Sequence, residues 1–118
     1  MKKIVFIWVI LLILFLSGCS SNNITGNAIG GKETAKEFNI DAFQFGYSPD
    51  AITVNKGDKV KININNVDVP HGIRIPDLGL KGEKTIEFTA DKTGEFIWYC
   101  LIPCGQGHMQ MKGKLIIK

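Results

Sequence analysis

From residue 36 onward the chain alternates apolar and polar side chains with a period of two, the pattern of strands that bury one face. The apolar positions are Phe38, Ile40, Ala42, Ile52, Val54, Val60, Ile62, Ile64, Ile73, Ile75, Ile86 and Phe88. Turn sequences such as Asn55-Lys56-Gly57-Asp58 separate the runs, and no run shows helical periodicity. The pattern therefore predicts an all-β sandwich of about seven short strands.

Two stretches depart from this simple alternation. Phe43, Phe45 and Tyr47 alternate in the opposite phase to the run before them, which indicates a bulge or a new strand. We expect these three aromatic side chains to lie in the core and not to bind a substrate. Residues Phe96–Cys100 are apolar at nearly every position, which is typical of a strand covered on both faces, and Lys112–Ile117 is the expected neighbouring strand.

The first 18 residues are of a different kind. Lys2 and Lys3 precede thirteen apolar residues. As a helix these would span about 20 Å, against roughly 30 Å of hydrocarbon in a bilayer. A basic start, a short apolar core and small residues after it are typical of a secretory signal, and Leu16-Ser17-Gly18-Cys19 is similar to the lipobox of prokaryotic lipoproteins. We expect a signal peptide over residues 1–18 and a lipid on Cys19, the alternative being an uncleaved anchor helix. Both place the protein at the cell membrane, on its extracytoplasmic face.

Composition divides the remainder into a linker and one domain. Residues 19–35 are rich in Asn, Gly and Ser and have few apolar side chains, so they are predicted to be a flexible linker before a domain over residues 36–118. The formal net charge is +3, and loss of Lys2 and Lys3 leaves 12 basic against 11 acidic residues, or +1. Without a basic cluster we expect no nucleic-acid partner.

The most reactive side chains lie in one stretch near the C-terminus. Residues 100–111, CLIPCGQGHMQM, hold two thiols, one imidazole and the thioether of Met111. These side chains are ligands of soft or borderline transition metals, not of calcium or magnesium. The chain has only one other histidine, His71, which follows Pro70 just before a predicted strand. We therefore predict a metal site built from Cys100, Cys104, His108, Met111 and His71.

The spacing alone leaves several alternatives open. The two cysteines and two histidines could close a zinc tetrahedron, but such sites leave methionine out. A mononuclear blue-copper site needs one cysteine, two histidines and an axial methionine, which leaves Cys100 without a role. In an exported protein Cys100 and Cys104 could also form a disulfide, which explains neither the histidines nor Met111. A second copper ion gives every one of these side chains a role.

The pattern C-x3-C-x3-H-x2-M, with Asp68-Val69-Pro70-His71-Gly72 upstream, resembles the dinuclear copper-A domain of cytochrome c oxidase subunit II and of nitrous oxide reductase. The resemblance covers residues 42–118 and implies a Greek-key β-sandwich of the cupredoxin fold. It also implies two copper ions bridged by Cys100 and Cys104. His71 and His108 would each cap one copper. Met111 would be a weak ligand to one copper, and the backbone carbonyl of Ile102 a weak ligand to the other.

Uncharged residues flank the predicted ligands. We expect Trp98, Ile102, Pro103 and Met109 to form an apolar shell that limits water near the metal. Met109 lies one residue out of the ligand pattern and is assigned to packing. An apolar end of the sandwich, with charges mainly on the strands, would suit contact with a partner protein.

The small number of metal-binding side chains also limits what this chain can do. Reduction of oxygen or nitrous oxide needs a haem or multinuclear copper core with further histidines, and this chain has none left. We therefore expect no enzymatic activity of the chain alone and no small-molecule substrate. The expected function is electron transfer with a cytochrome or an oxidase core. The most specific form of this prediction is a subunit through which electrons enter a terminal oxidase. Copper storage or delivery, and a mononuclear blue-copper carrier, are the alternatives.

Overall fold

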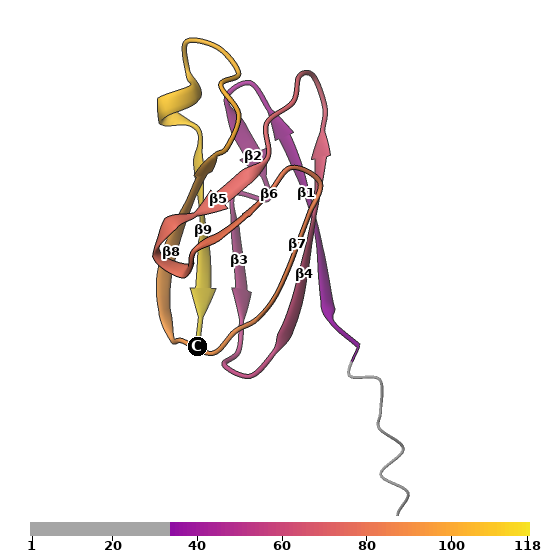
Figure 1. Ribbon diagram of the computed structural model, residues 1–118, viewed down its shortest axis with the longest axis vertical. Coiled ribbons are helices and arrows are strands. Elements are labelled where there is room, and N and C mark those ends of the chain that lie inside the picture. The colour runs from indigo at the N-terminus through magenta and orange to yellow at the C-terminus, as the bar shows by residue number, and fades with distance from the viewer. Residues whose placement is uncertain (1–33) are drawn as a thin grey trace, which may run out of the picture. The chain divides into compact units, whose positions relative to one another are not determined.

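The computed structural model describes residues 34–118, which form a sandwich of two β-sheets (Figure 1). The predicted signal or anchor segment, the lipidation site Cys19 and all but the last two residues of the predicted linker lie outside the described residues. Over residues 34–118, no helix has the length and apolar character needed to cross a bilayer.

The first sheet has four strands in the order β2-β1-β4-β7. These strands are β1 (Lys36–Phe43), β2 (Gly46–Ser48), β4 (Lys59–Asn66) and β7 (Thr85–Thr89). Strand β4 lies in the middle, parallel to β1 and antiparallel to β7.

The second sheet has five strands in the order β3-β9-β8-β5-β6. These strands are β3 (Ala51–Val54), β5 (Ile73–Ile75), β6 (Leu80–Gly82), β8 (Gly94–Cys100) and β9 (Lys112–Ile117). Two short 3₁₀ helices, η1 (Pro76–Leu78) and η2 (His108–Gln110), interrupt the connections. The predicted all-β sandwich is confirmed. The described residues hold nine strands, of which β2, β5 and β6 have only three residues each, and β6 was not predicted from the alternation.

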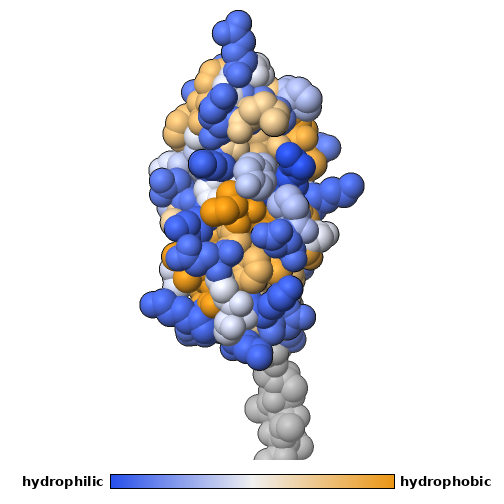
Figure 2. All heavy atoms as spheres, turned by 90° about the vertical axis from the view of Figure 1, so that its left-hand side faces the viewer, coloured by the Kyte–Doolittle hydropathy of each residue, from blue (hydrophilic) through white to orange (hydrophobic). Residues whose placement is uncertain are grey.

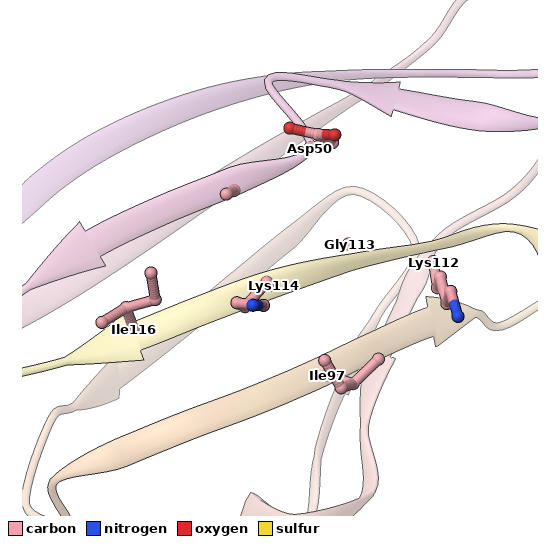
Figure 3. A pocket seen from close by; sticks show the side chains of 7 residues that line it. Asp50, Ile97, Lys112, Gly113, Lys114 and Ile116 are labelled. Carbon is pink, nitrogen blue, oxygen red and sulfur yellow. The ribbon is translucent and has the colours of Figure 1, made fainter.

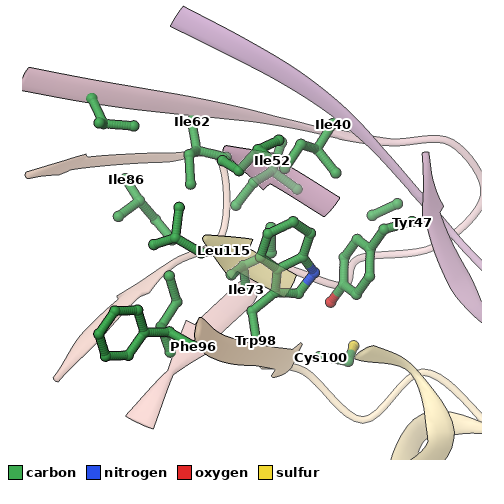
Figure 4. Close-up of a cluster of buried hydrophobic side chains, with 14 of the residues drawn as sticks. Ile40, Tyr47, Ile52, Ile62, Ile73, Ile86, Phe96, Trp98, Cys100 and Leu115 are labelled. Atoms are coloured by element: carbon green, nitrogen blue, oxygen red, sulfur yellow. The ribbon is translucent and has the colours of Figure 1, made fainter. Parts of the chain in front are cut away.

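The inward-facing residues of the alternating runs form the core between the sheets (Figure 4). Trp98 of β8 is completely buried and meets the ring of Tyr47 edge to face, with centroids 5.9 Å apart. Opposite it on β9 lies Gly113, where a Cβ atom would collide with the Trp98 ring. The buried strand positions include Ile40, Ala42, Ile52, Val54, Val60, Ile62, Ile64, Ile73, Ile75, Ile86, Phe96, Leu115 and Ile117.

The change of phase after β1 marks a new strand. Strand β1 ends at Phe43 and β2 begins at Gly46. Tyr47 is buried, but Phe43 and Phe45 are 37% and 42% exposed. The expectation that all three aromatics lie in the core is therefore wrong for two of them. Phe43 lies on the opposite face of β1 from the buried Ala42, and Phe45 lies in the turn between the two strands.

Strand β8 has only one fully buried face. Phe96, Trp98 and Cys100 point inward, whereas Ile97 and Tyr99 are half-buried on the outer face. Ile97 lines an open groove of about 380 Å³ there (Figure 3), whose other lining residues are Asp50, Ala51, Lys112, Gly113, Lys114 and Ile116. Figure 2 shows apolar residues in the middle of this side of the molecule with hydrophilic residues around them. The expectation of a strand covered on both faces is wrong, because no further layer within residues 34–118 packs on this sheet. The expected pairing of β8 with Lys112–Ile117 is confirmed.

Candidate metal centre

Strands β8 and β9 hold both ends of the C-terminal ligand loop. Cys100 is the last residue of β8, and Met111 immediately precedes β9. The two strands pair antiparallel up to Tyr99 and Lys112, and the amide of Cys100 donates to the carbonyl of Met111 at 3.2 Å. Because hydrogen bonds join the two ends, the loop between them has a fixed base.

The second ligand loop joins β4 to β5 and carries His71, which is completely buried. Its amide donates to the side-chain oxygen of Asn66 at 3.0 Å, and Pro70 before it has a fixed φ. The amide of Ile102 donates to the carbonyl of His71 at 2.8 Å. This bond joins the two ligand loops directly.

The donor atoms of all the predicted ligands converge. Cys100 Sγ lies 3.7 Å from Cys104 Sγ and 3.7 Å from His71 Nδ1. Cys104 Sγ lies 3.8 Å from His108 Nδ1 and 3.8 Å from Met111 Sδ. The carbonyl oxygen of Ile102 lies 3.1 Å from Cys100 Sγ. The structure thus brings together all six residues that the sequence analysis named.

These spacings fit a metal better than a disulfide. Two sulfur ligands about 2.3 Å from one tetrahedral ion lie about 3.7 Å apart, whereas a disulfide needs about 2.05 Å. Cys100 and Cys104 are free thiols at the larger separation. The donors of His71, Cys100 and Cys104 all lie within 4.8 Å of one another. With a thioether added to thiolates and imidazoles, the donor set suits copper.

A carboxylate holds the far side of the His71 ring. Asp68 Oδ1 lies 2.6 Å from His71 Nε2, and the carboxylate also accepts the amides of Gln44 and Val69 at 2.7 Å each. The bond to His71, followed by that to the Gln44 amide, lowers the pKa of Asp68 to about 2. A carboxylate in this place fixes the ring orientation of a metal-binding histidine.

Burial keeps the Cys100 thiol protonated when no metal is bound. Desolvation, followed by the hydrogen bond with Cys104, raises the pKa of Cys100 to about 11. Desolvation also raises the pKa of Tyr47 well above its usual range. A buried thiolate needs a nearby cation to offset its lost hydration, so binding of a metal ion here releases protons.

Residues without a predicted site role also contact the ligand loops, among them Gln44, Phe45, Tyr47, Asn66 and Asp68. Asp68 stands three residues before His71, a spacing that could have suggested the carboxylate–imidazole pair. The first three lie far from either ligand loop in sequence. Only the tertiary structure brings them to the site.

The apolar shell expected around the metal ligands is present only on the side that faces the core. Trp98 is buried beneath the site and Ile102 is half-buried. Pro103 is exposed, and Met109 is 76% exposed, so the expectation that Met109 packs is wrong. Both lie in the loop beyond the ends of β8 and β9, where no other element of the described chain covers them.

A two-sheet sandwich with a cysteine, histidine and methionine cluster at one end defines a copper-binding electron-transfer domain. Comparison with known proteins agrees with this class. Residues 5–117 match the cupredoxin-like domain family, and the chain belongs to that family.

Two kinds of relatives share the sequence. Cytochrome c oxidase subunit 2 of Thermus thermophilus is 32% identical over 83 residues, which cover 65% of this chain and 62% of that protein. Nitrous-oxide reductase of Stutzerimonas stutzeri is 34% identical over 76 residues, covering 56% of this chain and 12% of that protein. The chain thus spans less than two thirds of the length of these relatives.

Solved structures share the fold. A reduced amicyanin variant superposes with a TM-score of 0.52 at 23% identity, covering 70% of this chain and 82% of that one. A fern plastocyanin variant gives 0.53 at 21% identity, covering 69% of this chain and all of that one. At these identities the likeness supports the cupredoxin fold alone.

Proposed function

We propose that this protein is a one-electron carrier with a dinuclear, copper-A-like centre. The observation that supports it most strongly is the pair of free thiols 3.7 Å apart, each with its own additional donors. His71 and the Ile102 carbonyl lie beside Cys100, while His108 and Met111 lie beside Cys104. A single ion would not use two thiols and all of these donors, whereas two bridged ions would.

In this proposal Cys100 and Cys104 would hold both ions, His71 and His108 would each bind one, and Met111 and the Ile102 carbonyl would be weak ligands. The bound pair supplies a site that gains or loses one electron with its charge shared over two metals. The chain keeps the ligands in place in both oxidation states. The sheet holds Cys100 and Met111, Asp68 orients His71, and the buried core below excludes water.

The relatives suggest the kind of partner. Both are redox proteins by name, and this chain spans only part of each. We propose that a cytochrome donates one electron to the centre and that an oxidase core accepts it, as for a subunit through which electrons enter a terminal oxidase. The chain itself is not proposed to catalyse a reaction.

We also propose that the protein is held at the extracytoplasmic face of the cell membrane. The support is the basic start, the apolar segment and the sequence Leu16-Ser17-Gly18-Cys19. Mass spectrometry of the mature N-terminus distinguishes the two forms of attachment. A lipid-modified Cys19 as first residue supports the lipoprotein, and an intact Met1 supports the anchor helix. A Cys19→Ala variant would carry no lipid at this position.

Copper content and electron paramagnetic resonance of the copper-loaded full-length protein test the centre. Two copper ions per chain, with one unpaired electron shared between them, are expected, and Cys100→Ser or Cys104→Ser should abolish the shared signal. One copper per chain with a single-copper spectrum would replace this proposal with a mononuclear carrier. Ready loss of copper on reduction would favour a delivery protein.

A further inference from the structure

The turn between β1 and β2 contacts both ligand loops without supplying a ligand. The amide of Gln44 donates to Asp68 Oδ2 at 2.7 Å, and Asp68 in turn holds the His71 ring. The side-chain amide of Gln44 donates to the backbone carbonyl of Cys104. One residue thus bonds to the loop of His71 and to the loop of Cys104 at the same time.

The next residue, Phe45, lies against the backbone of the C-terminal ligand loop. A Cβ atom on Gly105 would lie 3.1 Å from the Phe45 ring, and one on Gly107 would collide with it. Gly107 directly precedes His108, so glycine at this position allows the ring to reach the chain beside a predicted ligand. At 42% exposure, Phe45 is no core residue, and this contact accounts for its position.

Tyr47 attaches the turn to the core. Its ring is buried against Trp98, with centroids 5.9 Å apart (Figure 4). Its hydroxyl donates to the carbonyl of Gly72, the residue after His71, at 2.9 Å. The turn therefore has a rigid base at Tyr47 and contacts the two ligand loops through Gln44 and Phe45.

We propose that residues 44–47, the β1–β2 clamp, position the two ligand loops before metal arrives. Gln44, Phe45 and Tyr47 are positioning residues, and the inference rests on the proposed metal centre. Loops held in their bound arrangement lose less freedom when the ligand binds, which raises affinity. Without the clamp, direct bonds between the loops, such as that from the Ile102 amide to the His71 carbonyl, would have to hold the site.

A matched pair of variants tests the clamp in the metal-free full-length protein. Phe45→Ala removes the ring on the ligand loop. Phe43→Ala removes a ring that is 37% exposed and lies against Gly46 within the same turn. Amide hydrogen exchange is measured at His108 and Gln110, whose amides bond to the carbonyls of Gly105 and Gly107. We expect exchange roughly tenfold faster in Phe45→Ala and unchanged in Phe43→Ala.

A rescue experiment separates clamping from general destabilisation. Gly107→Ala should weaken copper binding because its new Cβ collides with Phe45. Adding Phe45→Ala removes the obstacle, so the double variant should bind copper more tightly than Gly107→Ala alone. Gln44→Met, which keeps the length of the side chain but lacks its amide donor, should bind copper roughly fivefold more weakly than wild type, the effect of one lost hydrogen bond.

Equal exchange rates in Phe45→Ala and wild type, or no rescue in the double variant, would overturn the clamp. The exchange experiment uses no metal, so its result is independent of the number of copper ions. A dinuclear spectrum, with amide exchange rates that Phe45→Ala does not change, would leave the proposed function standing and remove the clamp. Faster amide exchange in Phe45→Ala together with a single-copper spectrum would remove the dinuclear centre and leave the clamp standing.

Discussion

Asp68 Oδ1 lies 2.6 Å from His71 Nε2, and the opposite ring nitrogen of His71, Nδ1, faces Cys100 Sγ at 3.7 Å. The carboxylate therefore decides which nitrogen is presented to the metal. Asp68 is itself held by the amides of Gln44 and Val69. The imidazole is fixed by a chain of hydrogen bonds that begins in the β1–β2 turn.

The first prediction concerns this pair. Asp68→Asn should lower copper affinity about 10- to 100-fold, since an amide is a weaker acceptor for the ring N–H. Competition with a copper chelator measures the affinity. Asp91→Asn, in the turn before β8 and hence at the opposite end of that strand from Cys100, is the control and should bind like wild type. Equal affinities in the two variants would show that Asp68 is not needed to orient His71.

Met111 is predicted to tune the centre more than to hold it. Its side chain is completely buried, with Sδ 3.8 Å from Cys104 Sγ. Met111→Leu conserves volume, so the unfolding free energy should fall by less than about 1.5 kcal/mol. The variant should keep its copper and change its reduction potential, because a thioether would be a weak ligand that tunes the metal more than it holds it. Loss of all copper from a folded variant would make Met111 an essential ligand.

The contact between Gly113 and Trp98 predicts a strong effect on stability. A Cβ at residue 113 collides with the indole ring, so Gly113→Ala should cost about 1–3 kcal/mol of unfolding free energy. Within the described residues, Trp98 Nε1 has no hydrogen-bond partner. Trp98→Phe shortens the ring and should reduce the cost of Gly113→Ala. A double-mutant cycle by urea unfolding measures the coupling, and strictly additive effects would contradict the contact.

Periodicity predicted the sandwich because burial in most of the longer strands follows the alternation of side chains, as in β4, where Val60, Ile62 and Ile64 face inward. It failed in the β1–β2 turn, where Phe45 is apolar for a reason unrelated to the core. Local pattern cannot distinguish a ring that packs in the core from one that lies on a neighbouring loop. It also could not show that the outer face of β8 lacks a covering layer within residues 34–118.

Five of the six ligand candidates could be named from sequence because their side chains are chemically rare and four of them are close together, whereas the carbonyl of Ile102 was named only from the resemblance to the copper-A domain. His71 was included because the chain has just one other histidine. The residues that position them escaped notice for the opposite reason. Gln44 contacts Cys104 across sixty positions of sequence through an ordinary amide, and nothing in its neighbours marks it.

Stability in acid should depend on Asp58, at the turn between β3 and β4. Its carboxylate accepts Lys36 Nζ and the Asn55 amide at 2.7 Å each. The bond to Lys36, followed by that to Asn55, lowers the pKa of Asp58 in the folded state. An unfolded chain has an aspartate pKa of about 3.9, so the stabilisation is complete above that value and is lost as the pH falls through the folded pKa.

Asp58→Asn should therefore be less stable than wild type at pH 7, and the difference should shrink below about pH 4. Urea unfolding at several pH values measures it. Lys36→Gln, which leaves the Asn55 bond in place, should show a smaller difference with the same trend. If the difference in unfolding free energy between Asp58→Asn and wild type stays constant down to pH 2, the charge of Asp58 does not contribute to stability.

The last prediction concerns the surface through which electrons reach the centre. Met109 is 76% exposed, and the exposed Pro70 and Pro103 and half-buried Ile102 are also uncharged residues of the two ligand loops. Apolar surface rimmed by polar residues marks a protein contact. Exposed charges are screened over about 8 Å at physiological ionic strength, so association through this end should depend little on salt.

Stopped-flow oxidation of a reduced cytochrome c by the copper-loaded protein measures the rate. Met109→Asp and Ile102→Asp should each lower it about tenfold, since a buried, unpaired charge opposes docking. Lys61→Glu, which reverses a charge on β4 where Lys61 pairs with Glu37 at 3.2 Å, is the control and should leave the rate unchanged. A rate that falls steeply with added salt and responds to Lys61→Glu, but not to Met109→Asp, would move the contact to the strand that carries Lys59 and Lys61.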